Sequence, residues 1–254
     1  MRLIDTHCHL YLKEFESDLP AVMQRAKNAG VEKFCLPAID SEVIDDMLKL
    51  EELYPEKFFL MMGLHPGSVK EYYKDELKIV EDYLHKRKFI AVGEIGLDFY
   101  WDKTFIKEQY DAFHNQIEIG LNYNLPIVVH SRNATDECIE VVKQYSSLKG
   151  VFHCFSGNTE QAENLIELGF LLGIGGVVTF KNSGLDKVIE QIGLNHVIIE
   201  TDAPYLAPVP FRGKRNVPGY LKYVIEKLSL VSGKESEQVA KITTQNAINL
   251  FNLS

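Results

Sequence analysis

Six side chains that can bind a divalent metal ion occur at similar places along the sequence, each just after a short apolar run. They are His7, His9, Glu94, His130, His153 and Asp202. The apolar runs are rich in β-branched and aromatic residues, which is typical of buried strands. Imidazole nitrogens and carboxylate oxygens together suit several divalent metals. The pattern therefore predicts a metal centre where several strands end.

The first two of these residues are separated by one position at the end of the first predicted strand. Because successive side chains of a strand point to opposite faces, this spacing sends both imidazoles to the same face. His7 and His9 can then bind one ion together. Two unconnected polar residues at a strand end are the alternative, and the four other ligand-type residues weigh against it.

The size of the set bears on the number of ions. A single catalytic zinc uses about three protein ligands, so four imidazoles and two carboxylates fit two ions better. A carboxylate can bridge two ions about 3.5 to 4 Å apart, and Glu94 is the predicted bridge. Asp202 is predicted to be both a ligand and the general base that accepts a proton from water. Magnesium, manganese, zinc, nickel and iron all remain open.

Five further polar residues are candidates for contacts with a substrate. His65 follows the third predicted strand and is expected to face the same end of the strands. Arg132 follows the fifth strand, and its planar guanidinium could bind an anionic group. Arg212, Lys214 and Arg215 form a basic loop after the last strand, where a phosphate-binding loop would be useful. The alternatives are a turn histidine, a salt bridge and a solvated loop.

Two aromatic residues and three histidines have plainer interpretations. Tyr100 and Trp101 follow Glu94 closely, and their faces could stack a nucleobase. We expect packing in the core or within a loop instead. His85, His114 and His196 lie in helix-like segments or at a strand entry. We expect these three to be structural.

The ligand-type residues need a scaffold that brings strand ends together. Eight short apolar runs are candidate strands, at residues 3–4, 34–36, 58–62, 89–92, 127–129, 151–152, 170–174 and 197–199. The segments between them are long enough for the helices that parallel strands require. This order predicts an α/β fold, a single (β/α)8 TIM barrel over residues 1–254, with the site at the carboxyl ends of its strands. An open doubly wound sheet is the alternative, but no GxGxxG motif follows the first strand.

Two helices have clear boundaries in the sequence. Asp18 is a plausible N-cap, Pro20 falls in the first turn, and Gly30 ends the apolar periodicity. At the end of the chain, Ser236 can cap a helix whose apolar residues recur at helical spacing up to Leu250. We therefore expect the chain to close on a helix.

Composition limits the class of protein. Of the 254 residues, 46% are hydrophobic and 25% charged, which suits a globular protein with a real core. The net charge of -9 argues against a broadly basic nucleic-acid-binding surface. A local metal site can still hold an anionic substrate. Four scattered cysteines and the lack of a long apolar run predict a cytoplasmic protein with reduced thiols and no membrane span.

Several motifs together resemble one family, the TatD family of metal-dependent deoxyribonucleases. They are Asp5-Thr6-His7-Cys8-His9-Leu10, Gly93-Glu94-Ile95-Gly96-Leu97-Asp98, Val129-His130-Ser131-Arg132, His153-Cys154-Phe155-Ser156-Gly157, Glu200-Thr201-Asp202-Ala203-Pro204-Tyr205-Leu206 and Arg212-Gly213-Lys214-Arg215-Asn216. The resemblance implies an amidohydrolase-type barrel with a divalent metal centre at the six ligand-type residues. It also implies hydrolysis of DNA phosphodiesters, commonly as a 3'-to-5' exonuclease. We expect single strands or 3' ends of DNA as the substrate and a monomer as the working unit.

Other functions use nearly the same scaffold. A metal-dependent amidohydrolase or deaminase would cleave a carbon–nitrogen bond, and a related enzyme would cleave the ester of an aminoacyl-tRNA. Many two-metal amidohydrolases have a lysine on the fourth strand, whereas this chain has Glu94. A barrel without activity is a third alternative, and the complete ligand set argues against it.

Overall fold

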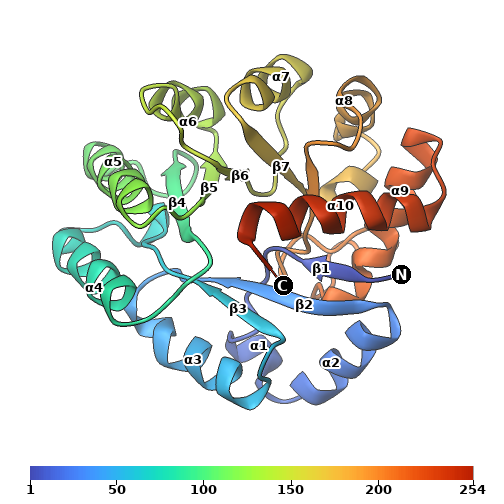
Figure 1. Ribbon diagram of the computed structural model, residues 1–254, viewed down its shortest axis with the longest axis horizontal. Coiled ribbons are helices and arrows are strands. Elements are labelled where there is room, and N and C mark those ends of the chain that lie inside the picture. Colours follow the sequence, from blue (N-terminus) through green and yellow to red (C-terminus); the bar gives the residue numbers. More distant parts are fainter. Residues whose placement is uncertain (254) are drawn as a thin grey trace.

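The computed structural model describes residues 1–253, and the chain alternates between strands and helices along this length (Figure 1). Ser254, the last residue of the predicted domain, lies outside the described residues. The strands are β1 (Leu3–Asp5), β2 (Val31–Pro37), β3 (Phe58–Met61), β4 (Val92–Asp98), β5 (Ile127–Arg132), β6 (Gly150–Phe152), β7 (Phe170–Ile174) and β8 (Val197–Ile199). The helices are α1 (Lys13–Glu16), α2 (Leu19–Asn28), α3 (Ile44–Leu53), α4 (Tyr73–Lys86), α5 (Ile106–Asn122), α6 (Thr135–Val142), α7 (Thr159–Glu167), α8 (Leu185–Ile192), α9 (Leu221–Ser232) and α10 (Ser236–Phe251). Short 3-10 helices are η1 (Ser41–Val43), η2 (Pro66–Ser68), η3 (Gly176–Thr179) and η4 (Pro218–Tyr220).

The described strands form two parallel sheets, with the orders β1-β2-β3 and β4-β5-β6-β7-β8. Two isolated bridges join these sheets, one between Met62 and Val92 and one between Cys8 and Ala203. At the second junction the backbone N–H of His9 donates to the carbonyl of Ala203 at 2.8 Å. These bonds connect the strands into a ring with helices around it (Figure 1). The predicted (β/α)8 barrel is confirmed.

Apolar side chains fill two layers of the barrel. One buried cluster, the inner cluster, takes residues from β1, β2, β3, β5, β6 and β8 and one residue just before β4, namely Ile4, Cys35, Met61, Ala91, Val128, Val151 and Ile198. A larger cluster between strands and helices includes Phe34, Phe113 and Phe152. Strands buried on both faces need apolar residues in succession rather than in alternation. This explains why the strands appear in the sequence as short continuous apolar runs.

Helix α10 covers the end of the barrel where the strands begin. Its Ala247 and Phe251 pack into the inner cluster. The side-chain amide of Asn246 donates to the carbonyls of Leu194 at 2.9 Å and Val197 at 2.8 Å. Figure 1 shows α10 lying across the strands on the side that faces the viewer. The other end of the barrel, where the strands lead into their loops, is therefore the end that can hold a site.

The ends of two helices test the predicted caps. Asp18 is the N-cap residue of α2, as predicted, and the chain turns after this helix at Gly30, where φ is 86°. The predicted cap of α10 is wrong by one position. Glu235 occupies the N-cap, and its side chain and that of Gln238 each accept the other's backbone N–H. A carboxylate can fill the role expected of Ser236 because it also accepts a backbone N–H.

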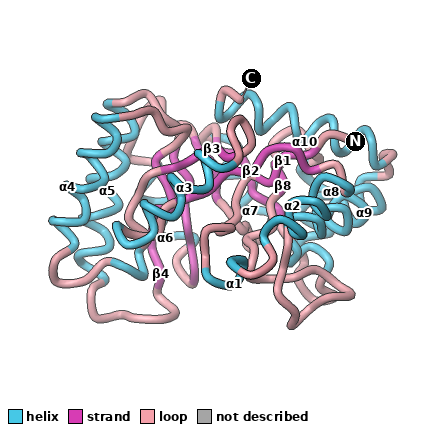
Figure 2. The backbone as a smooth tube through the Cα atoms, turned by 90° about the horizontal axis from the view of Figure 1, so that it is seen from below, coloured by secondary structure: helices cyan, strands magenta, loops and turns pink. Residues whose placement is uncertain are grey.

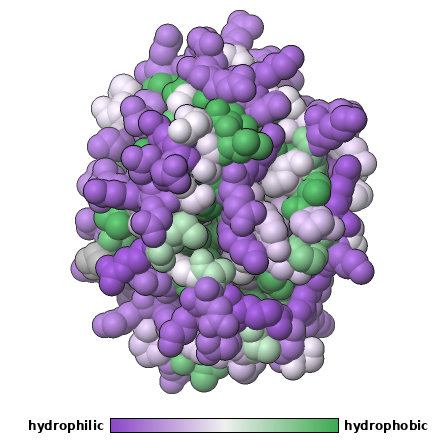
Figure 3. All heavy atoms as spheres, turned by 90° about the vertical axis from the view of Figure 1, so that its right-hand side faces the viewer, coloured by the Kyte–Doolittle hydropathy of each residue, from purple (hydrophilic) through white to green (hydrophobic). Residues whose placement is uncertain are grey.

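The two ends of the barrel differ in what covers them. Figure 2 shows both termini at one end and α1, with several long loops, at the other. On the flank that Figure 3 shows, hydrophilic residues predominate and hydrophobic areas are small. Within residues 1–253, no helix is both long and apolar enough to cross a membrane.

The fourth strand differs from its predicted position. Only Val92 of the apolar run at residues 89–92 belongs to the strand, and β4 continues to Asp98 in register with β5, where Asp98 pairs with Arg132. Glu94 and His130 thus lie within strands rather than after them. Glycine is uncommon in strands, so the presence of Gly96 argued against a strand over this segment when only the sequence was considered. Its φ is 138°, and a Cβ there would collide with the carbonyl oxygen of His130.

Replacing Gly96 tests this close approach. We expect Gly96→Ala to lower the free energy of unfolding by at least about 3 kcal/mol, because backbone strain adds to a clash with a neighbouring strand. Gly184→Ala is a matched control, since Gly184 also has a positive φ, of 74°, but has open space around it. Its expected cost is about 1 kcal/mol. Denaturant titration measures both, and equal losses would contradict the predicted clash.

Candidate metal centre

Glu94 lies at the centre of a buried group of imidazoles. Its side chain is 3% exposed. One carboxylate oxygen, Oε1, lies 2.8 Å from His130 Nδ1 and 2.8 Å from His153 Nε2. The other, Oε2, lies 3.1 Å from His7 Nε2. The strand pairing brings Glu94 of β4 and His130 of β5 to one point with His153, which directly follows β6, and His7, which follows β1.

The remaining two predicted ligands complete the same group. His9 Nε2 lies 3.4 Å from Asp202 Oδ1 and 3.9 Å from Glu94 Oε2. His7 Nε2 lies 3.9 Å from the same oxygen of Asp202. The structure thus brings all six sequence-predicted ligand residues together at the carboxyl ends of the strands.

The backbone fixes Asp202 beside the first strand. Its φ is 56°, a left-handed conformation that aspartate adopts more readily than most residues. Its N–H donates to the carbonyl of His7 at 2.9 Å, and its own carbonyl accepts from the N–H of Tyr205 at 2.8 Å. These bonds hold the turn in place, so the carboxylate faces His9.

His65 enters the same group, as predicted for a residue at this end of the barrel. Its Nδ1 accepts the N–H of Gly67 at 2.9 Å. Its Nε2 lies 3.3 Å from His130 Nδ1 and 3.6 Å from Glu94 Oε1. Burial lowers the pKa of His65 to about 3, so the imidazole is neutral near pH 7. With Nδ1 as an acceptor, the neutral ring carries its proton on Nε2, which faces Glu94.

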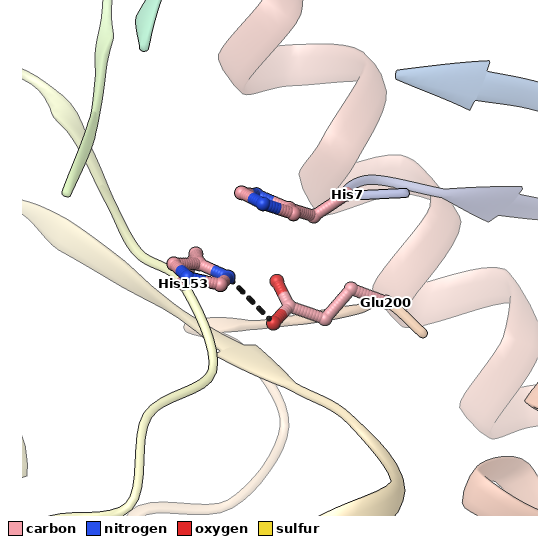
Figure 4. Close-up of side chains that lie close together, drawn as sticks. All are labelled: His7, His153 and Glu200. Atoms are coloured by element: carbon pink, nitrogen blue, oxygen red, sulfur yellow. Dashed lines mark ion pairs between the residues drawn. The ribbon is translucent and has the colours of Figure 1, made fainter. Parts of the chain in front are cut away.

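Glu200 is a buried carboxylate that the sequence interpretation did not include in the site. Its Oε1 accepts the N–H of Cys154 at 2.5 Å and lies 3.3 Å from His153 Nδ1. Figure 4 shows the carboxylate of Glu200 beside the rings of His7 and His153. A Cβ at Gly173 would collide with its other oxygen. An acidic residue directly after an apolar strand was the available signal, and a glycine in the neighbouring strand makes room for it.

Asp98 is a second residue that the sequence interpretation missed. Its Oδ2 lies 3.0 Å from His130 Nε2, while Glu94 lies against the other nitrogen of that ring. Burial opposes ionisation of Asp98, but hydrogen bonds from His130 and from two backbone N–H groups lower its pKa to about 2. A carboxylate in this position fixes the orientation of a histidine that binds a metal.

The charges in the group depend strongly on one another. Burial would raise the pKa of Glu94, but the imidazoles of His153, His7 and His65 hold that pKa well below its usual value. Burial would lower the pKa of His153, yet Glu94 and Glu200 hold it well above the ordinary range. Burial and the neighbouring His153 lower the pKa of His7. The metal-free group therefore combines ionised carboxylates with both protonated and neutral imidazoles.

The donor atoms fit divalent cations. Three sets of side chains each offer ligand atoms within 4.8 Å of one another, namely His7, His9 and Glu94, then His65, Glu94 and His130, then His7, His153 and Glu200. Within these sets two buried atoms have neither a hydrogen bond nor an ion pair, His7 Nδ1 and Glu200 Oε2. Buried polar atoms are rarely left without a partner, so such atoms point to an ion or water. Histidine and glutamate groups in this chain are thus positioned to hold metal ions.

The predicted substrate-contact residues have different surroundings. Arg132 lies over the rings of Tyr100 and Trp101, at 4.3 and 5.3 Å from the ring centroids. Arg212 lies over Phe180, 4.5 Å from its centroid, and Lys214 is exposed.

Arg215 differs from these because it is already paired. Its guanidinium donates to both carboxylate oxygens of Asp18, at 2.9 and 2.7 Å, and to the carbonyl of Glu14. The structure therefore favours a salt bridge for this residue. Its predicted contact with substrate stays a prediction.

His114, Tyr100 and Trp101, which were not predicted to bind the metal, have different surroundings. His114 Nδ1 lies 2.6 Å from the hydroxyl of Tyr145, outside the metal group, which agrees with a structural role. Of the two kinds of packing expected of Tyr100 and Trp101, in the core or within a loop, the structure shows the second, since their exposed fractions are 52% and 72%. These rings follow β4 where it projects beyond the barrel, so they contact each other and Arg132 instead of the core.

Comparison with known proteins agrees with this arrangement. Residues 4–252 match the family model described as TatD related DNase. The chain is 37% identical to the uncharacterized metal-dependent hydrolase YabD of Bacillus subtilis, over 99% of this chain and 100% of that protein. It is 33% identical to the uncharacterized metal-dependent hydrolase YcfH of Escherichia coli, over 100% and 97%.

A solved structure extends the likeness to the fold. The crystal structure of YjjV, a TatD homologue from Escherichia coli, superposes with a TM-score of 0.94 and 33% sequence identity. The match covers 100% of this chain and 99% of that chain. The resemblance inferred from the motifs is confirmed.

Metal binding should release protons near pH 7. Burial opposes protonation of His130 and His153, but Asp98, Glu94 and Glu200 raise the pKa of these imidazoles, and an ion must displace their protons. Affinity should therefore rise with pH through these raised pKa values. Calorimetric titration of metal-free protein with zinc, in buffers of different ionisation enthalpy, should show a net release of protons that falls as pH rises. Binding without proton release would contradict this account of the charges.

Proposed function

We propose that this chain, which belongs to the TatD-related DNase family, is a divalent-metal-dependent deoxyribonuclease that removes nucleotides from DNA in the 3'-to-5' direction. The match to that family over residues 4–252 is the observation that carries the proposal. The buried group around Glu94 supports it, because phosphodiester hydrolysis by this kind of site depends on divalent ions.

The proposed ligands of two ions are His7, His9, Glu94, His130, His153 and Asp202. Glu94 is the proposed bridge, because its two oxygens face different imidazoles, with His130 and His153 on one side and His7 on the other. Bound divalent ions would polarise a phosphoryl oxygen and lower the pKa of water towards about 7. Glu200 and Asp98 would orient His153 and His130 through the opposite ring nitrogens.

Asp202 is the proposed general base. Its side chain is 14% exposed, more than the 3% of Glu94, so it can reach a water molecule and a substrate. Burial would raise its pKa, but the hydrogen bond from His9 and the nearby imidazoles lower it. An ionised carboxylate can accept a proton. His65, with its proton on Nε2, is proposed to donate a hydrogen bond to the phosphate or to the leaving oxygen.

Basic side chains would hold the substrate. We propose that Arg132, Arg212 and Lys214 contact phosphate groups, since all three are exposed, Arg132 at the carboxyl end of β5 and the other two in the loop after β8. Arg215 would act mainly by fixing the basic loop against Asp18. Such local charges can attract DNA despite the overall charge of -9.

The proposed working unit is a cytoplasmic monomer with a single domain. All six proposed ligands come from one chain, so no second copy is needed to complete the site. Cys8, Cys35, Cys138 and Cys154 are free thiols, which is the usual state in a reducing compartment.

Hydrolysis of end-labelled DNA tests the proposal. Metal-stripped protein should not shorten single-stranded DNA, and added magnesium, manganese or zinc should restore shortening. Asp202→Asn should lower kcat at least about 100-fold, the range of a lost general base, and more if a ligand is lost as well. Asp45→Asn, at an exposed position on α3, is the matched control and should retain full activity.

One outcome would redirect the assignment. If folded, metal-loaded protein shortens no DNA with any of these ions, the nuclease proposal is wrong. The amidohydrolase and the aminoacyl-ester hydrolase would then be tested on the same preparation with small amides and aminoacyl esters.

The two arginines should respond differently to substitution. Arg132→Ala should weaken DNA binding and reduce the slope of log affinity against log salt by about one, as expected for one lost phosphate contact. Arg215→Ala should lower the unfolding temperature through loss of its pair with Asp18, with a smaller effect on the salt slope. Fluorescence anisotropy at several salt concentrations measures the slope. The reverse pattern would assign the phosphate contact to Arg215.

A further inference from the structure

Two exposed aromatic rings lie close to the metal centre. Trp101 is 72% exposed and Tyr100 is 52% exposed. Their ring centroids lie 4.9 Å apart and the rings are nearly perpendicular, at 87°. Large exposed aromatic side chains lose contact with water when a flat ligand covers them, so this pair offers free energy for binding.

The carboxylate of Asp98 connects the turn that carries these two rings to the metal centre. Asp98 Oδ1 accepts the backbone N–H groups of Tyr100 at 2.9 Å and Trp101 at 3.1 Å. The other oxygen of the same carboxylate lies 3.0 Å from Nε2 of His130, a proposed metal ligand. The turn that carries the two rings is thus held in a defined position beside the site.

Arg132 adds a positive charge to the same surface. It pairs with Asp98 in the ladder between β4 and β5, and the N–H of Phe99 donates to its carbonyl at 2.9 Å. Its guanidinium lies 4.3 Å from the ring centroid of Tyr100. Within residues 1–253, no carboxylate lies within ion-pairing distance of Arg132. The charge is therefore free to meet an anion beside the aromatic faces.

We infer that Trp101 stacks against an unpaired nucleobase of the DNA strand and that Tyr100, perpendicular to it, contacts the edge of that base, while Arg132 holds a phosphate of the same strand and the scissile phosphate lies at the metal centre. This inference rests on the proposed nuclease function. A flat base matches the exposed rings, and the adjacent phosphate matches the unpaired guanidinium. Both faces of a base inside a duplex are covered by its neighbours. The surface therefore selects single-stranded ends over paired ones.

Intrinsic fluorescence gives a direct readout because Trp101 is the only tryptophan of the chain. The probe is a phosphorothioate oligothymidylate of about eight nucleotides, within the range that one single-strand site covers. Titration into metal-loaded protein should quench the emission in a saturable way. An abasic deoxyribose-phosphate strand of equal length should still bind through its phosphates but leave the emission nearly unchanged.

Substitutions separate stacking from folding. Trp101→Ala should weaken binding of the oligothymidylate roughly 5- to 100-fold, the range measured for one stacked base, and Trp101→Phe should recover most of this affinity. With the abasic strand, wild type and Trp101→Ala should bind equally well. Leu230→Ala is the control, since Leu230 is equally exposed, at 78%, near the carboxyl end of α9. It should bind both strands as wild type does.

The outcomes distinguish the two proposals. If labelled DNA binds and is shortened but Trp101 emission does not change, or if Trp101→Ala loses affinity equally for both strands, the stacking inference is overturned and the nuclease proposal stands. If anisotropy detects no DNA binding and no metal restores shortening, the nuclease proposal fails and the stacking inference fails with it.

Discussion

The structure depends on a carboxylate that is buried among imidazoles. Glu94 is almost inaccessible, and His7, His130 and His153 approach its two oxygens to within 3.1 Å. A buried charge is costly unless it is paired, and here the partners are themselves buried or, for His130, largely buried, so they need further partners. Asp98 and Glu200 supply these partners on the far side of His130 and His153. Two buried polar atoms of the group, His7 Nδ1 and Glu200 Oε2, still lack a partner, which is what a site for cations leads us to expect.

The barrel supplies the conditions under which such a group can exist. Helix α10 and the inner apolar cluster cover the end where the strands begin, so polar side chains gather at the other end. Gly96 allows β4 to pass close to His130, and Gly173 leaves space for the carboxylate of Glu200. The positive φ of Asp202 sets its side chain against His9 rather than towards solvent. Packing, backbone conformation and charge therefore all specify the same arrangement.

Much of this arrangement could be predicted from the sequence, because it depends on local patterns. Continuous apolar runs mark strands buried on both faces, and the spacing of His7 and His9 places them on one face. Asp98 and Glu200 escaped prediction because their importance lies in contacts with His130 and His153, far away in the chain. The full length of β4 was not predicted because this strand contains glycines, which lower its strand propensity. The glycines are needed because the neighbouring strand β5 passes too close for a Cβ atom. The exposure of Trp101 depends on where that strand ends, which no local pattern specifies.

The central claim is that Glu94 lies between two divalent ions. Anomalous diffraction from crystals grown with manganese, collected to a resolution that separates the ions, tests it most directly. The account predicts two peaks about 3.5 to 4 Å apart, with one oxygen of Glu94 facing each. One ligand group should include His7 and His9, and the other His130. A single peak at full occupancy, or two peaks that Glu94 does not join, would contradict the account.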